Sequence, residues 1–159
     1  MHLDAKLELT VPYSPEQVFD LVGDHRNFPR TIAKTLLVPG VVRSEPLPGS
    51  AESGVGSRRR LNLTDGTTMD EEVTAFERPV EHSYRWLKPP PMPIALIVRS
   101  AQGSWRFAPD GQGTRIHWTY RFELSSPLAL PLALPLVAAF RSWMGKSADC
   151  VQALLKERA

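Results

Sequence analysis

Cysteine is almost absent from this chain of 159 residues, which contains only Cys150. One thiol cannot form an intrachain disulfide or a thiolate zinc site, so the composition does not indicate an oxidising compartment, and a cytoplasmic location is expected. The N-terminus also lacks a cationic start followed by an apolar run, so no secretory signal is predicted.

The chain also lacks an excess of charge and a long uninterrupted apolar run. Its 19 Lys and Arg residues nearly balance 17 Asp and Glu residues, and a formal net charge of +2 argues against a strongly basic nucleic-acid binder. No charged residue occurs between Glu123 and Arg141, but Pro127, Pro131 and Pro135 interrupt this stretch. It is also shorter than the roughly 20 apolar residues of a spanning helix. No transmembrane segment and no nucleic-acid partner are therefore predicted.

Motifs for metals and cofactors are missing as well. The four histidines show neither His-x-His nor His-Glu-x-x-His spacing. Gly54-Val55-Gly56 lacks the third glycine of a dinucleotide-binding loop, and no serine has the spacing of a nucleophile elbow. The sequence therefore predicts no metal site and no cofactor, and it leaves the catalytic residues unknown.

The N-terminal part of the chain shows a strand pattern followed by a helix start. In residues 3–11 apolar and polar side chains alternate strictly, which predicts a strand with one solvated face. Ser14 and Gln17 can form a capping box around Pro15, so a short helix is expected to start there. A second short piece, helical or irregular, is expected through residues 27–29.

Six further strands and a long helix are predicted from the rest of the chain. The extended segments are 36–43, 55–63, a strand after the hairpin signal Asp65-Gly66, 80–88, 94–108 with a break near Arg99, and 114–124. From Leu136 onward the apolar residues fall on one helical stripe. The preceding segment 127–135 repeats a Pro-Leu-Ala-Leu unit and is too rich in proline for a regular helix.

This order of elements predicts an α+β fold. A curved seven-stranded antiparallel sheet is expected to wrap on the long C-terminal helix, with two short helices after the first strand. Residues 1–159 are expected to form a single domain. Because one helix is about 10 Å wide and the sheet is far wider, a cavity is expected between them.

The register of the hairpin at Asp65-Gly66 determines which charged side chains would face that cavity. With a loop of two or four residues, Arg59 lies opposite Glu72 and Arg60 opposite Glu71. The more apolar face of the hairpin is expected to point inward, and Arg59 and Glu72 lie on that face. An inward pair keeps donors and acceptors that a ligand's carbonyl or hydroxyl can use. The alternative is that both side chains reach to the rim and only balance each other.

Aromatic side chains are the other candidates for the cavity wall. They combine a large apolar area with one polar tip, which suits both a packed core and a ligand pocket. In the second hairpin, a four-residue loop is expected to set Trp105 opposite Ile116. His82 shares the aromatic face and is interpreted as an ordinary sheet histidine. Together with Arg59 and Glu72, the predicted ligand-binding residues are Tyr84, Trp86, Trp105, Trp118, Tyr120, Phe140, Trp143 and Met144.

Three groups of residues resemble motifs of one known superfamily. They are Val11 to Asp20 with Asp24 and Asn27-Phe28-Pro29, then Asp65-Gly66 with Glu72-Val73-Thr74, and finally Gly103 to Phe107 leading to Gly113 to Ile116. The chain is similar over nearly its whole length to the START-like, or SRPBCC, superfamily, which includes polyketide cyclases/dehydrases, lipid-transfer domains and plant pollen-allergen proteins. The resemblance implies a helix-grip fold with an apolar cavity that holds a hydrophobic small molecule. The proline-rich segment 127–135 departs from the pattern expected of many relatives.

Three interpretations of function remain open on the sequence. The leading one is a protein that binds a hydrophobic small-molecule ligand, lipid or polyketide-like, with Arg59, Glu72, Tyr84 and Tyr120 orienting its polar groups. The second is an enzyme of the polyketide cyclase/dehydrase kind, in which Arg59 or Tyr120 polarises a carbonyl and Glu72 or His82 moves a proton. The third makes the Pro-Leu segment 127–136 a docking element for a membrane surface or a partner protein.

Overall fold

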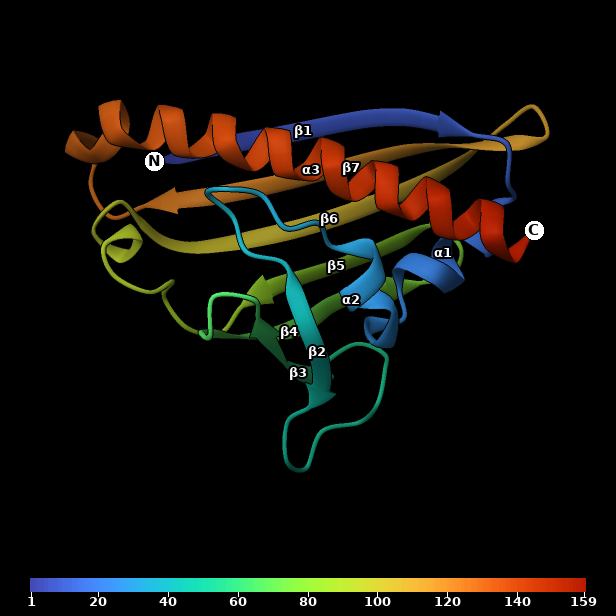
Figure 1. The fold of residues 1–159 in the computed structure, drawn as a ribbon, viewed down its shortest axis with the longest axis horizontal. Helices are drawn as coiled ribbons and strands as arrows, with labels where there is room; N and C mark the ends of the chain where they lie inside the picture. Colours follow the sequence, from blue (N-terminus) through green and yellow to red (C-terminus); the bar gives the residue numbers. More distant parts are fainter.

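One antiparallel sheet of seven strands forms the framework, and the long helix α3 lies across one of its faces (Figure 1). The computed structural model describes residues 1–159. The strands follow the order β1-β7-β6-β5-β4-β3-β2, so the first and last strands in sequence are neighbours and every other pair is a sequential hairpin or meander. The strands are β1 (His2–Val11), β2 (Val41–Pro46), β3 (Arg58–Leu63), β4 (Thr68–Glu77), β5 (Glu81–Trp86), β6 (Val98–Asp110) and β7 (Gly113–Leu124). The predicted α+β, helix-grip architecture is confirmed.

Two short helices, α1 (Pro15–Val22) and α2 (Phe28–Thr31), follow the first strand, with the short 3₁₀ turn η1 (His25–Asn27) between them. The predicted capping box is present, because the Ser14 hydroxyl accepts from Gln17 N and the Gln17 side chain accepts from Ser14 N. These elements contact β2 and α3, so they close one end of the space between helix and sheet.

The C-terminal helix α3 (Leu130–Arg158) begins earlier than predicted. The sequence pattern indicated a start at Leu136, but the proline-rich segment forms a 3₁₀ turn η3 (Pro127–Ala129) and the first turns of α3. Pro131 lies in the first helical turn, where the missing N–H has no helical partner to lose. Pro135 lies inside the helix, near its start, and removes one further backbone hydrogen bond.

Several strand boundaries also differ from the prediction, for local backbone reasons. The predicted strand 55–63 begins only at Arg58, because Gly54 and Gly56 adopt φ angles of +94° and +85° that no extended strand uses. The predicted strand at 36–43 is replaced by a loop followed by β2. Residues 94–96 form a short 3₁₀ turn, η2 (Ile94–Leu96), so the sixth strand begins at Val98.

The core lies between α3 and the sheet. A single cluster of 24 buried residues joins the inner sides of β1, β5, β6 and β7 to α1 and to the buried stripe of α3. At its centre Trp105 and Trp118 are cross-strand partners whose rings stack at 4.1 Å. The predicted pairing of Trp105 with Ile116 is wrong, because the turn after Asp110 has two residues rather than four.

Candidate functional site

A cavity lies between the sheet and α3. Its volume is about 260 Å³, and 20 of the 28 residues on its wall are hydrophobic. The wall is formed by inward side chains of β3 to β7, by α2 and the loop after it, by the loop between β5 and β6, and by α3. All four tryptophans of the chain lie on it. The hollow expected from the width of the sheet is therefore present.

Most of the predicted ligand-binding residues lie on this wall. The seven that do are Tyr84, Trp86, Trp105, Trp118, Tyr120, Phe140 and Trp143. Met144 is fully buried in the core cluster and is not on the wall, and Arg59 is buried next to the wall residue Glu71. Glu72 is the one predicted residue that points away from the cavity. It lies on the outer face, where it pairs with Arg58 and Arg85.

The prediction that Glu72 faces inward is wrong because of a single residue in the β3–β4 hairpin. Leu63 N donates to the carbonyl oxygen of Thr67, which leaves a three-residue loop with Gly66 at a φ of +85°. The predicted two- or four-residue loop shifts the pairing by one position, and a shift by one exchanges the two faces of a strand. Arg59 is therefore paired with Glu71, which the predicted register places on the outer face. The Asp-Gly signal is correct, but the predicted loop length is wrong.

Arg59 and Glu71 form a buried ion pair beside the cavity. Nε and Nη2 of Arg59 both donate to Oε1 of Glu71, at 3.1 and 3.0 Å, and only 6% and 4% of the two side chains is exposed. The guanidinium carbon lies 4.6 Å from the ring centroid of Phe28 and 5.3 Å from that of Tyr84. Burial raises the pKa of the Glu71 carboxyl, and the charge and hydrogen bonds of Arg59 oppose that shift. Because a guanidinium stays cationic at neutral pH, a protonated Glu71 would leave a buried charge uncompensated, and we treat the pair as ionised.

Two tyrosines supply hydroxyl groups to the same wall. The Tyr84 hydroxyl accepts a hydrogen bond from Trp118 Nε1 at 3.3 Å, and its ring lies 5.9 Å from that of Tyr120. Burial, with the nearby charge of Glu71 as the next cause, raises the pKa of Tyr84 to about 12, and burial raises the pKa of Tyr120 well above its usual value. Both hydroxyls therefore keep their protons at neutral pH. Gly103 makes room for Tyr84, because a Cβ there would collide with the tyrosine ring.

His82 is buried without any hydrogen bond. Its two ring nitrogens are the only fully buried side-chain nitrogen or oxygen atoms that have no partner. The ring lies 5.8 Å from Phe76 and 6.5 Å from Phe19, both in edge-on contact. Burial, followed by the charge of Arg59, lowers the pKa of His82 to about 3. This side chain is a neutral, buried member of an aromatic cluster on the inner face of β5.

Three segments of the chain carry exposed large apolar side chains, and two of these segments reach the cavity. Leu37 and Met92 lie on the cavity wall and are nevertheless 74% and 66% exposed, so they mark its mouth. The other large exposed apolar residues of these segments are Leu36, Leu96, Leu128, Leu132 and Leu134. The segment Pro127–Arg158 is apolar and long enough to cross a membrane by length and composition, with a mean hydropathy of 1.4 over 18 residues, of which 28% are buried. One side of this helix packs into the core from Ala133 to Leu155, as the central helix of a folded domain does.

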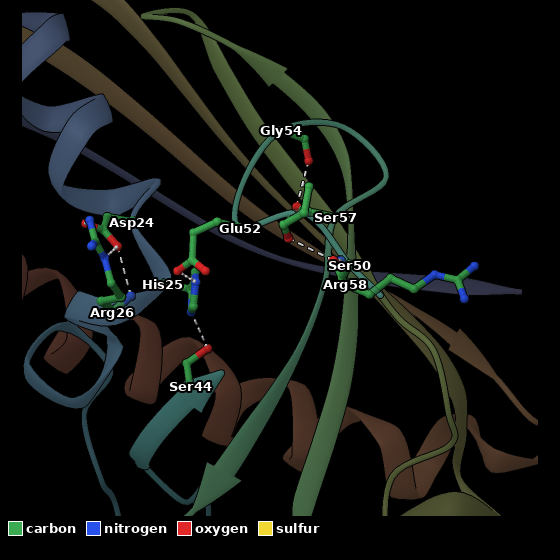
Figure 2. A network of polar contacts seen from close by, with 10 residues as sticks. Asp24, His25, Arg26, Ser44, Ser50, Glu52, Gly54, Ser57 and Arg58 are labelled. Carbon is green, nitrogen blue, oxygen red and sulfur yellow. Dashed lines mark hydrogen bonds and ion pairs between the residues drawn. The ribbon is translucent and has the colours of Figure 1, made fainter. Parts of the chain in front are cut away.

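A second polar cluster lies away from this cavity, at η1 and the loop between β2 and β3. Figure 2 shows the His25 ring between Ser44 and Glu52, with Nδ1 2.9 Å from the serine hydroxyl and Nε2 3.0 Å from the glutamate. None of these three side chains lines the cavity under α3. They therefore act as a brace that ties the long β2–β3 loop to η1.

The chain belongs to the family of polyketide cyclase / dehydrase and lipid transport proteins, which matches residues 2–159. This confirms the resemblance to the START-like superfamily that the motifs indicated. No curated protein sequence matches the chain.

Solved structures share the fold at low sequence identity. Norcoclaurine synthase from Thalictrum flavum, in complex with dopamine and hydroxybenzaldehyde, has a TM-score of 0.74 and 14% identity over 100% of this chain and 89% of its own. Protein MLL2253 from Mesorhizobium loti has a TM-score of 0.73 at 16% identity, with 99% of both chains covered. TTHA0849 from Thermus thermophilus has a TM-score of 0.71 at 20% identity, again over 99% of both chains. These likenesses show a common fold and assign no ligand.

Proposed function

We propose that this protein binds a hydrophobic small molecule, lipid or polyketide-like, in the cavity between the sheet and α3. The observation that carries the proposal is a cavity of about 260 Å³ whose wall is mostly apolar and includes four tryptophans. Removal of ligand carbon from water would supply most of the binding free energy, at about 25 cal/mol per Å² before ordering costs. The few polar groups on the wall would orient the ligand. The cytoplasmic location stays a prediction from the cysteine count.

Native mass spectrometry of the purified protein, together with titration of the neutral apolar fluorophore N-phenyl-1-naphthylamine, tests this proposal. We expect a co-purified apolar molecule or saturable uptake of the fluorophore. Leu136→Trp should reduce uptake, because Leu136 lies on the cavity wall. Leu134→Trp is the matched control on the same helix, because Leu134 is exposed and off the wall. An empty protein that takes up no fluorophore would contradict the proposal.

A second candidate function is catalysis of the polyketide cyclase/dehydrase kind in the same cavity. The observation that favours it is the presence of a carboxylate, Glu71, and two protonated hydroxyls, Tyr84 and Tyr120, on one wall. The proton-transfer role predicted for Glu72 passes to Glu71, since Glu72 faces outward. His82 takes no part, because its nitrogens are sealed in the aromatic cluster. Faster cyclisation of a linear poly-β-ketone thioester than in buffer, with loss of that rate in Tyr120→Phe, would support this function.

A third proposal is that the Pro-Leu segment 127–136 contacts a lipid surface. Leu128 in η3 and Leu132 in the first turn of α3 are 89% and 63% exposed, and no charged side chain separates them from the rest of the Pro-Leu segment. Exposed apolar patches of this kind mark interaction sites in soluble proteins. Cosedimentation with phosphatidylcholine vesicles should fall in the double variant Leu128→Ser, Leu132→Ser. Equal sedimentation of both proteins would contradict lipid contact.

A further inference from the structure

The cavity wall contains a charged hydrogen-bond acceptor that the protein leaves unused. Both Arg59 donors reach Oε1 of Glu71, and Oε2 has no protein partner. The side chain lies on the cavity wall with 4% of its surface exposed, and Oε2 is not among the atoms that are sealed off without a partner. Glu71 therefore brings to the cavity wall a carboxylate oxygen that is accessible and has no protein partner.

The hydroxyl group of Tyr84 is a hydrogen-bond donor close to this acceptor. Glu71 is paired with Trp86 and Val73 with Tyr84 across β4 and β5, so Glu71 and Tyr84 are diagonal neighbours on the inner face. Tyr84 accepts from Trp118 and keeps its own proton free for a further acceptor. This end of the cavity thus offers one carboxylate oxygen that needs a donor and a tyrosine hydroxyl that can donate.

We propose that the cavity selects amphiphiles whose buried end is a hydroxyl group, which donates to Glu71 Oε2 and accepts from Tyr84. This inference rests on the proposed ligand-binding function and names the class of ligand that the site takes. A hydroxyl is matched because it is donor and acceptor at once. An ether or ketone can accept from Tyr84 but leaves the carboxylate oxygen without a donor once water is displaced.

The size of the expected selectivity follows from the charge on the acceptor. A buried acceptor that loses its partner costs free energy, and the cost is larger for a charged group than for a neutral one. Sites that bind a hydroxyl in this way reject analogues that lack it far more strongly than apolar pockets reject a missing methylene. A ligand carboxylate is disfavoured as well, because Arg59 is already neutralised by Glu71. We expect at least a roughly tenfold preference for an alcohol over its isomeric ether.

The test compares octan-1-ol with 1-methoxyheptane, which are isomers with nine non-hydrogen atoms. Because the two isomers have the same atoms and nearly the same size, the cavity of about 260 Å³ constrains them equally. Binding is measured by isothermal titration calorimetry and by tryptophan emission, since every tryptophan lies on the wall. Tighter binding of the alcohol by a factor of about ten or more supports the inference, and equal binding or a preference for the ether overturns it.

Paired variants test whether the ion pair causes the preference. Replacing both partners, Arg59→Met with Glu71→Leu, leaves no unpaired buried charge and is expected to fold, because apolar replacement of a buried ion pair is often neutral or stabilising. This double variant should bind the two isomers equally. The matched control, Arg60→Met with Asp70→Leu, removes the adjacent ion pair on the outer face and should keep the full preference.

The outcomes separate this inference from the proposed function. Failure of both isomers and of N-phenyl-1-naphthylamine to bind would contradict ligand binding itself, and the hydroxyl preference would fail with it. Binding of both isomers with equal affinity by the wild-type protein would leave ligand binding intact and reject the role of Glu71. A preference that persists in the Arg59→Met, Glu71→Leu variant would also reject that role.

Discussion

Three consecutive arginines on β3 make ion pairs with three consecutive acidic residues on β4, yet the pairs have different surroundings. Arg60 and Asp70 lie on the outer face, with 44% and 15% of their side chains exposed, whereas Arg59 and Glu71 are 6% and 4% exposed. The hydrogen bond from Arg60 lowers the pKa of Asp70, while burial raises the pKa of Glu71 despite its arginine. Acidic residues one position apart thus have pKa values shifted in opposite directions, because the pleat sends one pair to water and the other to the cavity.

The largest expected effect is that of breaking the inner pair. Glu71→Ala leaves Arg59 buried without a counter-charge and should lower the free energy of unfolding by about 3 to 5 kcal/mol. Glu72→Ala removes a carboxylate from the outer face and should cost less than about 1 kcal/mol. Urea denaturation of both variants gives the two values, and equal losses would show that burial does not distinguish the pairs.

The buried His82 sharpens the comparison, because it has no partner at all. Its pKa is about 3 in the folded protein against 6.5 in the unfolded chain. Between these values the unfolded chain binds more protons than the folded protein. The contribution of His82 to the free energy of unfolding is therefore complete above pH 6.5 and is lost as the pH falls towards 3. We expect the wild-type protein to lose about 2 kcal/mol more than His82→Phe between about pH 7.5 and pH 5. Chemical denaturation at both pH values measures this, and parallel losses would contradict a neutral buried ring.

A substitution at Phe28 tests whether its ring contributes to the stability of the buried Arg59. Its ring lies under the Arg59 guanidinium, and no aromatic ring faces Arg58 or Arg60. Phe28→Leu keeps the site apolar and should cost about 1 to 2 kcal/mol through the lost cation–π contact and packing. The loss should shrink in the Arg59→Met, Glu71→Leu background, which a double-mutant cycle measures, and an unchanged loss would assign the effect to packing alone.

The smallest effect is expected at the outer pair. Asp70→Asn should change the free energy of unfolding by less than about 1 kcal/mol at neutral pH, and about 1 M salt should reduce the difference. Because the folded pKa of Asp70 is lowered from 3.8, its contribution is present above that value and is lost as the pH falls through the folded pKa. Thermal melts at about pH 7 and pH 2 measure the difference, which should shrink at the lower pH. A large, salt-independent loss would mean that Asp70 behaves like Glu71.

Most of the helices and strands could be predicted from local sequence patterns. The wrong predictions include the start of α3 and the two hairpin registers, which depend on the length of a turn. The alternation in β1 and β7 and the capping box of Ser14 and Gln17 agree with the structure. The predicted start of α3 is too late because prolines that disrupt a helix interior are tolerated in its first turns. The two predicted hairpin registers are wrong because Asp-Gly turns of two, three and four residues look alike along the chain.

The residues of the candidate site also divide into those placed by alternation along a strand and those placed by loop length or long-range packing. Five of the seven aromatic wall residues that the sequence predicted lie on the sheet, because alternation along the strands places them on one face, whatever the register. Glu71 was missed because its face depends on a single residue in the β3–β4 loop. No local pattern showed that Phe28 and the loops at Leu37 and Met92 close the cavity, since they meet it only through long-range packing.

Periodicity and capping in the amino-acid sequence by themselves determined the α+β class, because they are properties of neighbouring residues. The helix-grip architecture and the family followed from the resemblance of three groups of residues to a known superfamily. Tertiary structure alone decided which acidic side chain pairs with Arg59, that His82 has no partner, and which loop residues close the cavity. Those outcomes depend on strand register and on side chains from distant segments, which occupy common space only after the sheet has wrapped around its helix.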